Sequence, residues 1–253
     1  MATTGTDGPI RTWREGPVRI VRIDRPRVRN AVDRETALAL GAAWDLFERE
    51  ADSRVAVLTG GDEVFSAGAD LTDLEGLAPG VEGEDGPLGF TRRSMSKPTI
   101  AAVAGWCLAG GLEMACWCDL RIADETAVFG CFERRFGVPL VDGGTQRLPR
   151  IVGLGRALDL ILTGRAVDAR EALALGLVTE VVPAGRSLER ALELARAIAA
   201  FPQLCLRSDR RAVYEGLGRD LAEGLRIEAR RGAEVLASGE AEAGARAFRE
   251  GKR

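Results

Sequence analysis

Glu113 is one candidate for acid–base chemistry in this chain. It follows Gly110 and Gly111 in the apolar segment 105–120, which is expected to run from a buried strand into a helix. Positions 110 and 113 share one face of the first helical turn. A main-chain N–H without a partner and a carboxylate could therefore face the same small volume. The simpler alternative is a glutamate placed near a helix start to suit the helix dipole.

Glu133 is a second candidate, and it lies in the segment 129–153 directly after a short expected strand. Asp142 and the turn residues 143–145 follow, and they predict the start of another helix. The simpler alternative for Glu133 is a surface salt bridge with Arg134 or Arg135.

The segment 65–71, with the sequence FSAGADL, is a third candidate. Gly68 lets the backbone come close to a ligand, because glycine has no Cβ atom. Amides that enter a following helix lack partners and can bind an anion. A plain turn followed by a helix N-cap is the simpler alternative.

The chain contains no histidine, which excludes Ser-His-Asp and Cys-His catalysis and any histidine-based metal site. Acid–base work near neutral pH therefore falls to carboxylates, lysines, cysteines or the single tyrosine, Tyr214. The five cysteines lie mostly in apolar segments, which favours buried free thiols. No GxxxxGK[ST] motif occurs and no GxGxxG motif follows a strand, and Val64 takes the first glycine position of a GxSxG motif around Ser66.

Charge and hydropathy predict a cytoplasmic protein. The chain has 35 basic and 38 acidic residues, a net charge of −3, and both signs are scattered, whereas nucleic-acid-binding proteins concentrate basic residues on one face. The N-terminal segment lacks the apolar stretch of a signal peptide. The longest apolar run, 100–112, is too short to span a bilayer. We therefore expect neither a nucleic-acid partner nor a membrane.

Strand and helix patterns alternate along the first two thirds of the chain. Asp33 is expected to N-cap a helix whose apolar face carries Leu40, Trp44 and Phe47. A helix is also expected over Gly110–Trp117, and the glycine-rich, acidic segment 76–89 predicts a mobile loop. Strands are expected at Val18–Ile23, 55–58, 100–103, 120–123, 127–130 and 178–182.

After Ser187 the chain is expected to be helical almost to its end, with a break at Phe201 and Pro202. A length of 253 residues suits one large α/β core with a helical extension better than two full domains.

Taken together, the three candidate segments resemble the crotonase family of enoyl-CoA hydratases and isomerases, and most closely its bacterial hydratases. The likeness runs through FSAGADL, KPTIAAVAGWCLAGGLEMACWCDLRIA, FGCFERRFGVPLVDGGTQRLPRIVG and DAREALALGLVTEVVP. It implies an α/β fold in which ββα units wind into a spiral, followed by a C-terminal helical region that forms trimers or hexamers. The implied parts are a flexible tail at 1–12, the spiral core with the acyl-CoA site at 13–198, and the trimerisation region at 199–253.

The resemblance also places the site. The family's two oxyanion amides fall on Ala69 and Gly110, which also count among the coenzyme A-binding positions. The adenine contact falls on Ala67, and Arg27 and Val28 are further positions expected to bind coenzyme A.

The family's two hydratase glutamates align with Glu113 and Glu133. The resemblance thus implies a hydratase of fatty-acid metabolism that adds water across the Cα–Cβ bond of a 2-enoyl-CoA thioester. Glu133 would move the proton at Cα and Glu113 would activate the water. No separate cofactor or metal is expected, because coenzyme A is part of the substrate. The alternatives are an isomerase that uses Glu133 alone and, from another class, a non-catalytic acyl-CoA-binding or RNA-binding module.

Three features depart from the family pattern. Asp142 stands where a small apolar residue is usual, and we expect it to cap the helix from Gly143, with a third polar group in the site as the alternative. Arg134 and Arg135 are bulkier than the usual apolar pair. The terminal aromatic and lysine with which many relatives hold coenzyme A have no counterpart, and Phe248 is the nearest aromatic.

Overall fold

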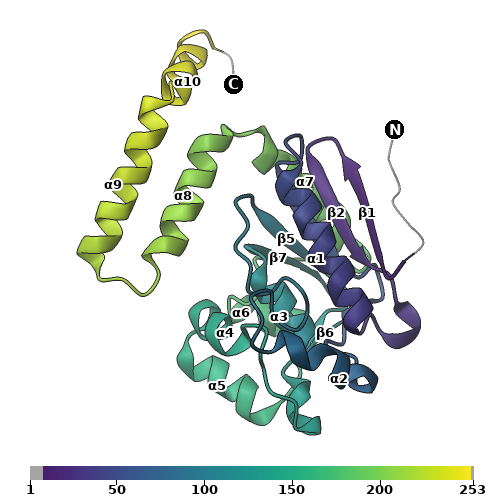
Figure 1. The fold of residues 1–253 in the computed structure, drawn as a ribbon. Helices are drawn as coiled ribbons and strands as arrows, with labels where there is room; N and C mark the ends of the chain where they lie inside the picture. The colour runs from purple at the N-terminus through teal and green to yellow at the C-terminus, as the bar shows by residue number, and fades with distance from the viewer. Residues whose placement is uncertain (1–7, 252–253) are drawn as a thin grey trace.

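The computed structural model describes residues 8–251. It contains two β-sheets with helices packed around them (Figure 1). The chain adds one strand to each sheet in turn, so that β3 is followed by β4, β5 by β6 and β7 by β8. The six-stranded sheet has the spatial order β1 (Ile10–Glu15), β2 (Val18–Ile23), β3 (Val55–Thr59), β5 (Thr99–Val103), β7 (Leu120–Asp124), β10 (Glu180–Val182). The four-stranded sheet has the order β4 (Val64–Ser66), β6 (Trp106–Leu108), β8 (Val128–Gly130), β9 (Val167–Asp168).

The strands of the large sheet are parallel except for β1, which pairs antiparallel with β2. Every residue of β3 and β5 is buried, as expected for parallel strands that are covered on both faces. Alternate side chains face opposite layers, as the period-two geometry of a strand requires. Ala56 and Leu58 pack with the cluster around helix α1 (Arg34–Arg49), whereas Val55 and Val57 pack with helix α7 (Ser187–Ala200).

The remaining helices cover the two sheets or follow them. Short 3-10 turns occur at Pro26–Val28, Leu71–Asp73, Ala78–Gly80 and Phe132–Phe136. The helices are α1 (Arg34–Arg49), α2 (Leu74–Leu77), α3 (Gly110–Trp117), α4 (Gly144–Val152), α5 (Leu154–Thr163), α6 (Ala169–Ala174), α7 (Ser187–Ala200), α8 (Gln203–Gly216), α9 (Leu221–Ala237), α10 (Glu240–Arg249).

Helix α1 forms where the sequence predicts it. The Asp33 carboxylate accepts a hydrogen bond from the Thr36 amide at 2.8 Å, which satisfies one of the free N–H groups at the helix start. Leu40, Trp44 and Phe47 are fully buried on its inner face. Trp44 also packs against the ring of Trp117, so α1 and α3 are joined through one aromatic cluster.

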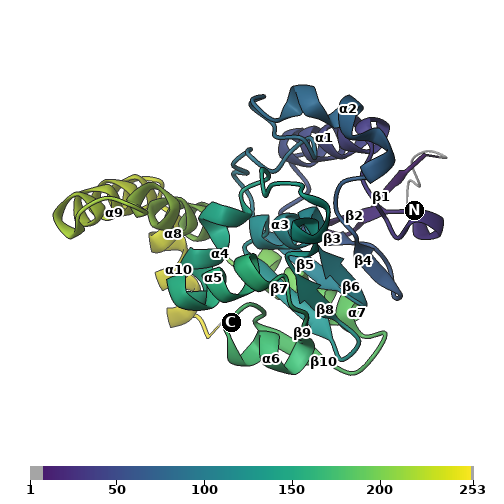
Figure 2. The ribbon, with the colours of Figure 1, turned by 90° about the horizontal axis from the view of Figure 1, so that it is seen from below.

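The last three helices stand away from the core as an arm, as Figures 1 and 2 show. Helices α8 and α9 pack against each other, and large apolar side chains on the arm are exposed, including Leu221 and Phe248 at 79% each. None of the helices in the described part of the chain is long and apolar enough to cross a membrane.

Two expected boundaries change. Residues 10–12 belong to β1 and not to a tail, because they pair with Val21 to Ile23 of β2, while residues 1–7 of the expected tail lie outside the described residues. The core extends past residue 198, since α7 packs on the large sheet through Ala199 and ends at Ala200. The break at Phe201 and Pro202 is confirmed.

Candidate active site

The start of helix α3 presents one unpaired amide. Ala109 has a φ of 51°, a left-handed conformation that is uncommon for a residue with a Cβ atom, and it directly precedes the helix. Its own N–H donates to Gly130 of strand β8, which fixes this sharp turn. The amide of Gly110, the first helical residue, donates to no atom of residues 8–251. It is therefore available to a ligand.

The second unpaired amide is that of Ala69. The Val32 amide donates to the Gly68 carbonyl, and the Asp70 amide donates to the Val32 carbonyl. Because successive N–H groups of an extended chain point in opposite directions, the Ala69 N–H points away from Val32. No atom in the described chain accepts from it. The two amides are close, since a Cβ atom added to Gly68 would lie 2.5 Å from the Gly110 nitrogen, and one added to Gly110 would lie 3.4 Å from the Ala69 nitrogen.

Glu113 lies one turn into α3 with its side chain buried. Its Oε1 accepts hydrogen bonds from the amides of Asp142, at 3.0 Å, and Gly144, at 2.7 Å. A Cβ atom at position 144 would lie 2.9 Å from Oε1, so a larger residue there would displace the Glu113 carboxyl group. Burial, followed by the charge of Asp142, raises the pKa of Glu113 to about 8 despite these two amides.

Glu133 lies in the 3-10 turn that follows β8, and it too is buried. Neither carboxylate oxygen has a hydrogen-bond partner among the described residues. Burial raises the pKa of Glu133, and its own backbone amide and the charge of Arg134 offset only part of this effect. The simpler expectation of a salt bridge is wrong, because the Arg134 and Arg135 guanidinium groups donate instead to the carbonyls of Ile161 and Gly164.

Asp142 does not cap helix α4, which corrects the expectation from the sequence. The cap residue is Gly143, and the amide of Gly144 in the first turn of that helix donates to Glu113 and not to Asp142. The Oδ1 atom of Asp142 accepts from the Leu88 amide at 3.1 Å and from the Thr91 hydroxyl. Asp142 is thus turned away from the helix and toward the segment 86–91.

All three acidic residues line one cavity of about 730 Å³. Four other predicted positions line the same cavity, namely Val28, Ala67, Ala69 and Gly110. Arg27 does not line it and is exposed beside Val28. The structure therefore brings together every predicted site residue except Arg27.

The sequence did not single out the individual residues that form the walls of this cavity. One wall is apolar and contains Leu74, Leu77 and Val81, from within and just before the segment expected to be a loop. At another wall the Arg29 guanidinium lies 4.6 Å from the ring centre of Trp106. Trp106 is 42% exposed, and the apolar residues around it in the sequence gave no indication of this exposure.

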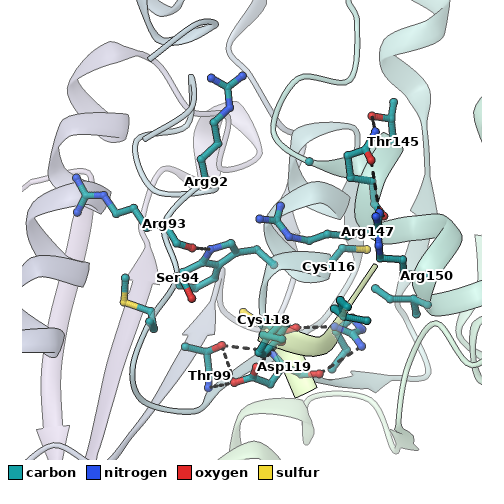
Figure 3. A pocket seen from close by; sticks show the side chains of 18 of the residues that line it. Arg92, Arg93, Ser94, Thr99, Cys116, Cys118, Asp119, Thr145, Arg147 and Arg150 are labelled. Atoms are coloured by element: carbon teal, nitrogen blue, oxygen red, sulfur yellow. Dashed lines mark hydrogen bonds between the residues drawn. The ribbon is translucent and has the colours of Figure 1, made fainter. Parts of the chain in front are cut away.

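A second cavity, of about 910 Å³, lies at the other end of α3 (Figure 3). Six arginines line it, and its single acidic residue, Asp119, is ion-paired with Arg210 at 2.9 Å. The buried Arg121 and the Arg147 guanidinium donate to backbone carbonyls. Among the residues that line this larger cavity there is no pair of acidic groups.

The cysteines offer no further centre. Cys107, Cys116, Cys118 and Cys131 are buried free thiols, and burial raises the pKa of each, so their thiolate forms are disfavoured. Cys205 is exposed, unlike the other four. No group of three or more metal-binding side chains is present in residues 8–251.

The chain is similar to proteins of one known family. The family model for enoyl-CoA hydratase/isomerase matches residues 14–253. The chain belongs to this family. It is 37% identical to an enoyl-CoA hydratase of Mycobacterium tuberculosis over 99% of this chain and 97% of that one. It is also 37% identical to a crotonyl-CoA hydratase of Syntrophomonas wolfei over 85% of each.

Solved structures of the family confirm the expected fold. An enoyl-CoA hydratase from Mycobacterium marinum superposes with a TM-score of 0.91 at 34% identity and covers 97% of each chain. An enoyl-CoA hydratase from Bacillus anthracis gives a TM-score of 0.88 at 32% identity, over 96% of this chain and 97% of that one. The expected spiral of ββα units with C-terminal helices is therefore correct.

Proposed function

We infer that this chain adds water across the Cα–Cβ double bond of a 2-enoyl-CoA thioester. The observation that carries this inference is one cavity with two unpaired amides, of Ala69 and Gly110, and two buried acidic residues, Glu113 and Glu133. Two relatives that match nearly the whole chain are named an enoyl-CoA hydratase and a probable enoyl-CoA hydratase.

The two amides would bind the thioester oxygen. When water adds at Cβ, the electrons of the double bond move toward the carbonyl, and its oxygen becomes an enolate. Fixed N–H donors aimed at that oxygen stabilise the charge without reorganising, and each is worth roughly 2.7–4 kcal/mol in comparable sites. Main-chain donors tolerate small side chains, so Ala69 and Gly110 suffice.

The two acidic residues would divide the proton transfers. Glu113 in its ionised form accepts a proton from the water whose oxygen bonds to Cβ. Glu133 in its protonated form donates a proton to Cα as the enolate collapses, so that one water is added in total. The raised pKa of Glu133 favours the acid form that this step needs.

Coenzyme A itself would enter past Ala67 and Val28, which both line the cavity. Arg27, which is exposed in the same 3-10 turn as Val28, would meet its phosphate groups from outside the cavity. The apolar wall of Leu74, Leu77 and Val81 would contact the acyl chain. In this scheme the coenzyme is part of the substrate.

Product mass tests the reaction. Purified enzyme is incubated with a panel of 2-enoyl-CoA thioesters, and the expected product is heavier than the substrate by one water. A second panel of 3-enoyl-CoA thioesters tests the isomerase alternative, in which Glu133 alone moves a proton and the mass is unchanged. Conversion of the second panel only, or of neither, would refute the hydratase assignment.

We also propose that the arm of α8–α10 joins copies of this chain into a trimer or a hexamer. Its exposed apolar residues, such as Leu221, Leu225 and Leu236, need a partner surface to be removed from water. Sedimentation equilibrium of the full chain measures the assembly. The double variant Leu221→Asp and Leu225→Asp should dissociate it, and a monomeric wild-type protein would contradict the proposal.

A further inference from the structure

The active-site cavity contains one acidic residue more than hydration requires. Asp142 is only 3% exposed, and it lines the cavity together with Glu113 and Glu133. Its Oδ1 atom accepts hydrogen bonds from the Leu88 amide and the Thr91 hydroxyl. Burying a carboxyl group that can ionise costs free energy, so we expect a role for Asp142.

We propose that Asp142 is a positioning residue of the active site, which acts through Glu113 by its charge and holds the segment 86–91 against the oxyanion amides. The proposal rests on the proposed function for its catalytic consequence. The effect of Asp142 on the pKa of Glu113 can be tested in the ligand-free protein, whatever reaction the enzyme catalyses.

The first link runs from Asp142 to Glu113. The Asp142 amide donates to Glu113 Oε1, so the two residues are neighbours although 29 positions separate them. After burial, the charge of Asp142 is the largest cause that raises the pKa of Glu113 to about 8. An ionised Asp142 thus delays ionisation of Glu113, because two like charges repel strongly in a buried site.

Other charged groups face Asp142 and Glu113, and the pKa of both residues is raised in spite of them. Arg92 and Arg147 lower the pKa of Asp142, while burial raises it by a larger effect. Arg147 comes from α4 and donates to the carbonyls of Asp142 and Thr91, from the side of the second cavity (Figure 3). The titratable groups that face the pair from the surrounding elements are Glu133, Cys116, Cys131, Arg92 and Arg147.

The second link runs from Asp142 to the oxyanion amides. Leu88, whose amide donates to Asp142, places its Cδ1 atom 2.9 Å from the position that a Cβ atom of Gly110 would take. Leu88 therefore covers the start of α3 where the Gly110 amide is unpaired. Loss of the Asp142 anchor would let this cover move.

The variant Asp142→Asn separates the two links. Asparagine keeps an oxygen that can accept from Leu88 and Thr91, so the segment stays anchored, but the negative charge is gone. The matched control is Thr91→Val, which removes one anchor and keeps the charge. If Asp142 acted only by anchoring the segment 86–91, Thr91→Val would have the larger effect on the site and Asp142→Asn the smaller one.

The measurement is the titration of Glu113 by NMR in the ligand-free enzyme with 13C-labelled glutamate carboxyl groups. Glu113→Gln identifies the resonance by its disappearance. In Asp142→Asn we expect the Glu113 midpoint to fall by roughly one pH unit. In Thr91→Val it should stay where it is in the wild type. An unchanged midpoint in Asp142→Asn, or an equal fall in Thr91→Val, would overturn the proposal.

Kinetics supply the second readout. In the hydration assay, the limb of the kcat/KM profile that reports Glu113 should move to lower pH in Asp142→Asn by the same amount, while Thr91→Val should lower kcat without moving this limb. A profile that stays in place in Asp142→Asn would overturn the catalytic part. If the enzyme hydrates no thioester, the proposed function fails, and the NMR result still decides whether Asp142 controls Glu113.

Discussion

The two ends of helix α3 open onto different cavities. At the N-terminal end, Gly110 and Glu113 line the smaller cavity, where two amides and both oxygens of Glu133 lack partners in residues 8–251. At the C-terminal end, Cys116 and Trp117 line the larger one, where Arg121 donates to three or more carbonyls and Asp119 pairs with Arg210.

The candidate active site is the smaller of the two cavities, so cavity volume alone does not identify it. Polar groups that are already satisfied stabilise the fold, because removing them exposes buried carbonyls or charges. Polar groups kept buried without partners destabilise the fold and are retained for a ligand. We therefore expect substitutions at the first end to affect turnover and those at the second to affect stability.

The largest effect is expected for Glu133→Gln, which removes the proposed acid without changing its shape. Because a positioned acid or base contributes about 10²–10⁴-fold, kcat for a short 2-enoyl-CoA should fall by about 10³-fold. The matched control is Asp119→Asn in the larger cavity, which should keep kcat within about twofold. Comparable losses of kcat in the two variants would break the contrast between the cavities.

Gly68→Ala should have the next largest effect. Gly68 has a φ of 91°, and its new Cβ atom would lie 2.5 Å from the Gly110 nitrogen, so the two amides must move apart. Loss of one oxyanion donor corresponds to about 10²–10³-fold in kcat. Gly153→Ala is the control, since Gly153 also has a positive φ but nothing within 4 Å of its added Cβ atom. If both variants lower only stability, measured by urea unfolding, the amide of Gly110 has no role in turnover.

Arg121→Met should show the opposite profile. Its guanidinium donates to Leu177 at 2.7 Å and Cys118 at 2.7 Å, and the substitution leaves these buried carbonyls without their donor. We expect the free energy of unfolding to fall by about 3 kcal/mol while kcat is retained. A large loss of kcat at unchanged stability would show that the second cavity takes part in catalysis.

Glu113→Gln should stabilise the protein, and most strongly in mild alkali. The folded-state pKa of Glu113 is about 8 and its ordinary value is 4.5, so the unfolded chain ionises first. Glu113 therefore does not lower the free energy of unfolding of the wild type below pH 4.5. It lowers this free energy increasingly as the pH rises, and the loss levels off above pH 8. Denaturation from pH 5 to pH 9 should therefore show a gain for the variant that grows by about 4 kcal/mol, because a difference of one pKa unit corresponds to roughly 1.4 kcal/mol. A gain that does not change with pH would refute the raised pKa.

Local sequence patterns predicted several elements correctly. Helix α3 begins at Gly110 and ends at Trp117 as expected, and Asp33 caps α1. The short strands β4 and β6 gave weaker signals, because three residues carry too little periodicity. Strand β1 was missed because its side chains are mostly half-exposed and its position depends on pairing with β2.

The sequence by itself determined the family, the absence of histidine chemistry and the identity of the two acidic residues, because residue types and their order are read directly from the chain. Only the tertiary structure decided that Asp142 turns from the helix that follows it to Leu88 and Thr91, which lie 54 and 51 positions away. It likewise decided that Glu133 is buried and unpaired. Burial and distant partners set the protonation of a carboxyl group, and neither is encoded in its neighbours along the chain.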